Sequence, residues 1–189
     1  KMMDKKSEIS YEDLNLPCSP AVKQKFGELE KEVETAFEGG YEAIKAFDSQ
    51  KLFIWMGKIV YGILHHDLVI EKKLKQAQGL EMSMSPVLKE RLGLFHLMLQ
   101  SFTAPITFIG DLRPWSVSVV PLKYSKDILN YRDDSVNMIF SLGVNGFGII
   151  GCLLDNGTVV KEHQYLVDKI GDAVLHPIQF QELCARFQY

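Results

Sequence analysis

The side chains best suited to binding an ion or moving a proton gather in one short stretch. His65, His66 and Asp67 are consecutive, and Glu71 follows four residues after Asp67. Imidazoles and carboxylates serve as metal ligands and proton carriers, and residues four apart share a helix face. Neighbouring histidines point about 100° apart on a helix, however. The sequence has no HExxH motif or zinc-type ligand pair, so we assign no metal and no cofactor; the alternative is a polar end to a long helix.

Asp111, Arg113 and Trp115 form a second candidate group, in a loop between two expected strands. A guanidinium beside a large aromatic ring can bind an anionic or planar ligand. The alternative is that Arg113 and Asp111 pin the loop while Trp115 is buried. The ligand-binding candidates are therefore His65, His66, Asp67, Asp111, Arg113 and Trp115. No residue is assigned a catalytic role, since the sequence has no GxSxG motif, no phosphate-binding loop and no diagnostic Cys–His spacing.

Two Asn-Gly pairs, Asn145-Gly146 and Asn156-Gly157, each lie between runs of strand-forming residues. Such pairs favour the tight turns of β-hairpins. Together they predict a three-stranded antiparallel meander over residues 136–162, with its third strand continuing through Val159 and Val160. In this register Val144 faces Phe147 and Leu142 faces Ile149, so one side of the sheet is apolar.

Gly143 and Gly148 face each other in the same register and leave a bare patch on the sheet. Missing side chains allow a ligand or another backbone to approach. The alternative, which we favour, is a bend in the sheet or a covering aromatic ring. The glycines lie within a hairpin, and not between a strand and a helix, so they do not form a nucleotide-binding loop.

Helices are predicted before the sheet. Ser19-Pro20 and Ser85-Pro86 each place a capping side chain before a proline at the first helical position. Apolar residues at helical spacing predict helices over 21–37, over 41–47, and from Asp48 or Ser49 through Leu64. A fourth helix follows residue 86, with the inward stripe Leu88, Leu92, Phe95, Leu99 and Phe102.

The remaining segments complete an α+β fold. Residues 115–124 predict a strand that Pro121 confines to a sheet edge. Residues 106–109 predict a strand or an extended link, and residues 125–134 a loop or short helix. We therefore expect a flexible lead-in over 1–18 and one domain over 19–189. That domain is helical over 19–104, sheet-rich over 105–165 and closed by a helix over 177–188.

Composition narrows the class of protein. A hydrophobic fraction of 47% is ordinary for a globular chain. A net charge of −3 gives no global reason to bind nucleic acid, although Lys72, Lys73 and Lys75 form a small basic cluster. Three widely spaced cysteines, Cys18, Cys152 and Cys184, indicate free thiols. Charged and polar residues interrupt the apolar run over 52–70, so we expect no membrane span and a cytoplasmic location.

Residues 52–64 read LFIWMGKIVYGIL and residues 176–183 read HPIQFQEL. Both resemble an uncharacterised bacterial protein family with a WxxKIxYGxL helix. Longer relatives in that group carry an HNH-like zinc module before this helix, and this chain has neither its cysteine pairs nor its HNH residues. The resemblance therefore implies no catalytic residue. What it implies is a setting near nucleic acid or phage defence.

The leading expectation is an interaction or accessory domain that acts through self-association or a protein partner. It follows from a sound core pattern without assembled chemistry. One alternative is a metal-dependent or small-molecule hydrolase that uses His65, His66, Asp67 or Arg113. The other is a nucleic-acid-associated protein related to HNH-type systems.

Overall fold

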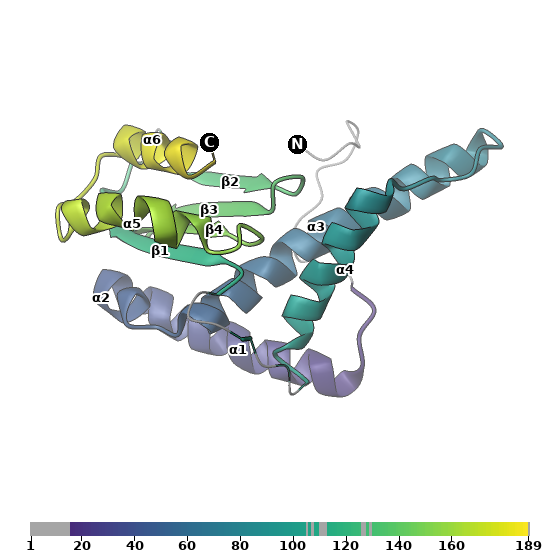
Figure 1. Ribbon diagram of the computed structural model, residues 1–189. Coiled ribbons are helices and arrows are strands. Elements are labelled where there is room, and N and C mark those ends of the chain that lie inside the picture. The colour runs from purple at the N-terminus through teal and green to yellow at the C-terminus, as the bar shows by residue number, and fades with distance from the viewer. Residues whose placement is uncertain are drawn as a thin grey trace.

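A four-stranded antiparallel sheet lies between two layers of helices in the computed structural model (Figure 1). The structure describes residues 16–104, 106, 108–109, 113–125, 128 and 130–188. The α+β class is confirmed. The elements are α1 (Pro20–Glu38), α2 (Gly40–Lys45), α3 (Ser49–Ala77), α4 (Pro86–Gln100), β1 (Ser116–Pro121), β2 (Tyr131–Asp134), β3 (Ile139–Val144), β4 (Phe147–Cys152), α5 (Thr158–Ile170) and α6 (Pro177–Gln188).

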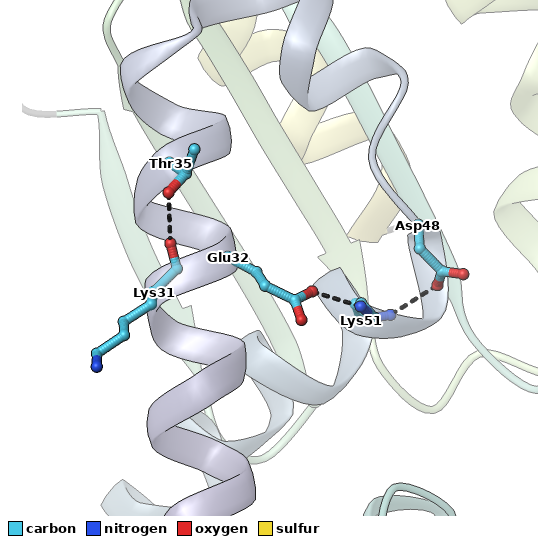
Figure 2. A network of polar contacts seen from close by, with 5 residues as sticks. All are labelled: Lys31, Glu32, Thr35, Asp48 and Lys51. Carbon is cyan, nitrogen blue, oxygen red and sulfur yellow. Dashed lines mark hydrogen bonds and ion pairs between the residues drawn. The ribbon is translucent and has the colours of Figure 1, made fainter.

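The long helices α1, α3 and α4 begin at the capping residues predicted from the sequence. The Ser19 hydroxyl accepts a hydrogen bond from the Val22 amide, and the Ser85 hydroxyl accepts one from the Leu88 amide. At the start of α3 the Asp48 carboxylate accepts from the Lys51 amide at 2.9 Å. Figure 2 shows that the Lys51 side chain also forms an ion pair with Glu32 of α1. The first turn of α3 is thus capped and tied to α1.

The sheet has the strand order β1-β4-β3-β2. Asn145 and Gly146 turn β3 into β4 with φ angles of 48° and 85°. The predicted register is confirmed, with Val144 opposite Phe147 and Leu142 opposite Ile149. Local turn chemistry therefore sets the centre of the sheet, and β1 joins from earlier in the chain, with Pro121 on an edge strand as expected.

The two sheet faces contact different helices. One face packs against α1–α4 in a core whose residues include Phe53, Trp115, Phe140, Phe147 and Ile149. The other face packs against α5 and α6 in a second core whose residues include Val120, Ile150, Val159, Phe180 and Leu183. Both faces are thus covered by apolar side chains.

The bare glycine patch is covered by side chains. A Cβ atom added at Gly148 would lie 2.7 Å from Phe180 Cδ2, because that ring of α6 rests directly on the backbone. At Gly143 an added Cβ would lie 2.7 Å from Asn130 Cβ. Of the alternatives, a covering aromatic ring is what the structure places over Gly148.

The prediction of a third meander strand after Asn156-Gly157 was wrong. Asn156 and Gly157 have left-handed φ angles of 54° and 71°, but the chain continues into α5 instead of a strand. The reason is the Asp155 carboxylate, which accepts hydrogen bonds from the Gly157 and Val159 amides at 3.0 Å each. It also accepts one from the Ser116 hydroxyl. These bonds satisfy amides that are otherwise unpaired at a helix start, so the sheet ends at Cys152 and not near residue 165.

Replacing Asp155 with alanine is expected to lower the free energy of unfolding by about 1–3 kcal/mol. The change removes both capping bonds and leaves the buried Ser116 hydroxyl without its acceptor. Urea unfolding followed by circular dichroism measures the loss. Asp172→Ala, which removes only an exposed ion pair to Lys45, should change stability little. Equal effects of the two substitutions would contradict the assigned role of Asp155.

The interpretation of residues 125–134 was also wrong, because Tyr131–Asp134 forms β2 and pairs with β3. The Asp134 carboxylate accepts hydrogen bonds from the Val136 and Asn137 amides and stabilises the turn into β3. Burial alone would raise the pKa of Asp134, but these bonds hold it below its usual range. In the segment over 106–109, the described residues 106, 108 and 109 are not in a strand.

By length and composition, α3 is apolar enough to cross a membrane. Of its most apolar window, 39% is buried within the molecule. Core helices of globular proteins pass the same test, so this property leaves the role of α3 open.

Candidate functional site

His66 and Asp67 lie in the second half of α3, near enough to Asp133 of β2 for its charge to act on Asp67. His66 Nδ1 and Asp67 Oδ1 are 3.9 Å apart, and both atoms are buried without a hydrogen-bond partner. Burial raises the pKa of the Asp67 carboxyl; the Asp133 charge acts in the same direction, and His66 opposes it. The pair is therefore a partly desolvated polar contact on one side of the helix.

Trp115 fills the core instead of lining an open site. It is 3% exposed, and its ring stacks on Phe53 with centroids 4.1 Å apart and planes at 12°. Arg113 is exposed, and its guanidinium lies over the Phe108 ring. The structure therefore agrees with the alternative in which Trp115 is buried and does not bind a ligand. Asp111 lies outside the described residues, so its predicted pairing with Arg113 stays a prediction.

The two candidate groups do not meet. Trp115 packs against Phe53, which precedes His66 by 13 residues on the same helix. At 1.5 Å per residue the two sites stand roughly 20 Å apart. Within the described ranges, no group of three or more His, Cys, Asp or Glu side chains could hold a metal ion. The described candidates thus lie at two separate places in the fold.

The cysteines divide by exposure. Cys18 is exposed, whereas Cys152 on β4 and Cys184 on α6 are buried. Burial raises the pKa of the Cys152 thiol to about 12 and that of Cys184 to about 11. Both buried thiols are therefore protonated near neutral pH and poor nucleophiles.

A cavity of about 390 Å³ opens between the end of β1 and the β3–β4 turn. Its polar lining includes Lys123, Tyr124 and Asn130, and its apolar lining includes Leu122 and Val144. Asn130 is only 8% exposed, and its Oδ1 atom makes no hydrogen bond. Sequence reasoning did not find this site, because its walls come from a loop without periodic pattern and from strands that meet only in the folded chain.

The end of α3, the following loop and α4 form a hairpin, here called the arm (residues 68–97). Its far end projects beyond the layered body (Figure 1). Among the described residues, six of the twelve exposed large apolar side chains lie on the arm: Val69, Leu74, Leu80, Val87, Leu94 and Leu97. Three of them, Val87, Leu94 and Leu97, lie within about 80° of one another around α4. Apolar side chains that gather on one exposed side of a helix are typical of an interaction site.

The inward stripe predicted for α4 is confirmed at Leu92, Phe95, Leu99 and Phe102, which lie in the core or pack against it. Phe95 and Met98 of α4 are buried, and a Cβ atom added at Gly57 of α3 would lie 2.6 Å from Leu99 Cδ2. The outer side, with Leu94 44% and Leu97 49% exposed, was not predicted. In the sequence, this outer side is indicated by Val87 and Leu94, which are seven residues apart and therefore share one helix face.

No family model, no curated protein and no solved structure matches this chain. The resemblance of α3 to a bacterial family therefore stays a prediction, and the function is inferred from the geometry alone.

Proposed function

We propose that this chain is a non-enzymatic interaction domain that self-associates through its arm. The observation that carries the proposal is the exposed apolar surface on a projecting hairpin. The described ligand-type side chains, by contrast, are spread over separate places. The layered body would then serve as the scaffold that holds the arm.

The helix α4 supports contact with a partner because its apolar surface extends beyond the side that packs on the core. Phe95 and Met98 face the interior, while Leu94 and Leu97 face outward. Apolar side chains that widen the stripe of a helix beyond its packed side are normally covered by a partner. Gly93 lies beside Leu97 on the exposed side, where an added Cβ atom would meet nothing within 4 Å. Such a glycine costs about 1 kcal/mol relative to alanine in a helix, and it leaves room for another backbone.

Charge favours a second copy of the chain as the occupant. The arm contains five basic and three acidic residues, a net charge of +2, whereas the whole chain has −3. The rest of the chain therefore carries −5, and the arm of one molecule is attracted to the body of another. The five basic residues are Lys72, Lys73, Lys75, Lys89 and Arg91.

Sedimentation velocity from low to high micromolar protein tests this proposal. The wild type should form a concentration-dependent dimer or larger assembly that weakens as salt is added. The double substitution Leu94→Glu with Leu97→Glu should weaken association at least about tenfold, or roughly 1.4 kcal/mol. It places two charges on the surface that must lose water.

Val174→Glu is the matched control, because Val174 is also exposed, at 65%, but lies outside the arm. It should associate like the wild type. A wild-type chain that stays monomeric over the whole concentration range would refute self-association. So would a double variant that associates as tightly as the control.

A further inference from the structure

The far end of the arm, here called the tip (residues 72–84), projects away from the layered body (Figure 1). Gly79 ends α3 there with a left-handed φ of 71°, and the Leu80 amide donates to the Lys75 carbonyl at 2.9 Å. This is the backbone bond of a Schellman cap, which folds the chain back at a helix end. The Leu80 side chain is thereby held at the apex of the arm, where it is 56% exposed.

Exposed apolar and basic side chains lie next to each other on the tip. Leu74 is 56% exposed, and Lys73 and Lys75 lie about 100° to either side of it around α3. Lys75 pairs with Glu71 at 2.8 Å, whereas Lys72 and Lys73 make no ion pair with any residue that the structure describes. Long lysine stems let an ammonium group reach a polar layer while a neighbouring leucine enters an apolar one.

The charge of the molecule is divided between the tip and the body. The tip contains three lysines and one glutamate, a net charge of +2. Because the whole chain has −3, the remainder carries −5. An extended anionic surface would attract the tip and repel the body, so the molecule would approach it with the arm foremost. The projecting tip can make that contact while the body stays outside it.

We propose that the tip docks on an anionic lipid surface, with Leu74 and Leu80 in the headgroup region and the lysines on the lipid phosphates. The tip is too short to span a bilayer and would lie in its interface. Nucleic acid would attract the lysines but offers the leucines no apolar layer. The tip also has no aromatic ring on which a base could stack.

Co-sedimentation with lipid vesicles tests the proposal on the full chain. The protein should bind vesicles of mixed phosphatidylserine and phosphatidylcholine, and pure phosphatidylcholine at least about tenfold more weakly. Added salt should weaken binding, because it screens the lysines. No binding up to millimolar lipid, or equal binding to both vesicle types, overturns the proposal. So does a duplex oligonucleotide that binds the tip more tightly than the mixed vesicles do.

Two double substitutions separate the charged contact from the apolar one. Lys72→Gln with Lys73→Gln should weaken vesicle binding at least about tenfold through lost attraction to the headgroups. Leu74→Gln with Leu80→Gln should weaken it to a similar extent, because no apolar side chain then enters the interface. All four positions are exposed, and circular dichroism checks that each variant folds. A leucine variant that binds like the wild type would overturn the lipid assignment.

Lys161→Gln with Lys169→Gln is the matched control for the lysine variant. It removes the same charge from exposed positions on α5 and leaves the tip intact. The control should bind vesicles like the wild type. If it loses as much binding as the tip variant, net charge and not the tip governs the contact, and the proposal fails. The tip does not include Leu94 or Leu97, so lipid docking and self-association can each fail without the other.

Discussion

Phe53→Ala is expected to lower the free energy of unfolding by about 3–5 kcal/mol, a large share of the stability of a domain this size. Phe53 is fully buried. Its ring stacks on Trp115 at 4.1 Å and meets the Phe95 ring edge-on at 6.4 Å. One side chain thus joins α3, α4 and the residue that precedes β1. Its removal leaves a cavity that three separate segments cannot close together.

Urea unfolding gives the size of this loss, and near-ultraviolet circular dichroism should show a weaker tryptophan signal as Trp115 loses its stacking partner. Tyr165→Ala serves as the control, because that ring is exposed and its loss should change stability by no more than about 0.5 kcal/mol. Equal unfolding midpoints for the two variants would show that the stack does not hold the core together.

Gly148→Ala is the second large effect, and its cause is crowding instead of a cavity. The new methyl group would stand 2.7 Å from Phe180 Cδ2 and 2.8 Å from Cζ. Phe180 is 1% exposed, so its ring has no free space to enter. Overpacking of this kind costs about 1–3 kcal/mol. Chemical denaturation should therefore show an earlier midpoint for this variant.

Gly27→Ala is the matched control for Gly148→Ala, because an added Cβ at Gly27 in α1 would meet nothing within 4 Å. There the substitution should stabilise by about 0.5–1 kcal/mol through higher helix propensity. Phe180→Leu should recover part of the loss at Gly148, since the two sites are in contact. Destabilisation at Gly148 that Phe180→Leu leaves unchanged would contradict the proposed clash.

The parts of the fold that the sequence predicts are those decided within a few residues. Ser19, Asp48 and Ser85 each cap the helix that follows them. Asn145-Gly146 sets the β3–β4 register, because the preferred twist of a two-residue turn determines which residues face each other. In these places local chemistry and tertiary packing agree.

The same reasoning failed where a local signal had two outcomes. Asn156-Gly157 has the left-handed φ angles of Asn145-Gly146, yet a helix follows it. The next segment acts together with the Asp155 cap: Val159, Leu166, Val167 and Ile170 recur at helical spacing and pack on the second core. The polar strand β2 gave no apolar alternation at all, so only its pairing with β3 reveals it.

The cavity at the end of β1 was not predicted from the sequence, for a related reason. Residues 65–67 are visible as candidates because they are neighbours in the sequence. The cavity brings together Lys123 and Asn130, which follow β1 and precede β2, with Gly143 and Gly146 of the central hairpin. Such convergence depends on strand order, which no short motif encodes.

The strand order also links occupancy of the cavity to completion of the sheet. The β3–β4 hairpin forms between neighbours in the chain, but β1 pairs with β4 residues that lie at least 26 positions later in the sequence. The Leu122 amide then donates to the Gly146 carbonyl at 2.9 Å. The pocket walls exist only after that step. Any small molecule that fills the pocket must therefore favour the sheet with β1 paired, by mass action. At a ligand concentration one hundred times the dissociation constant, the free energy of unfolding would rise by about 2.7 kcal/mol.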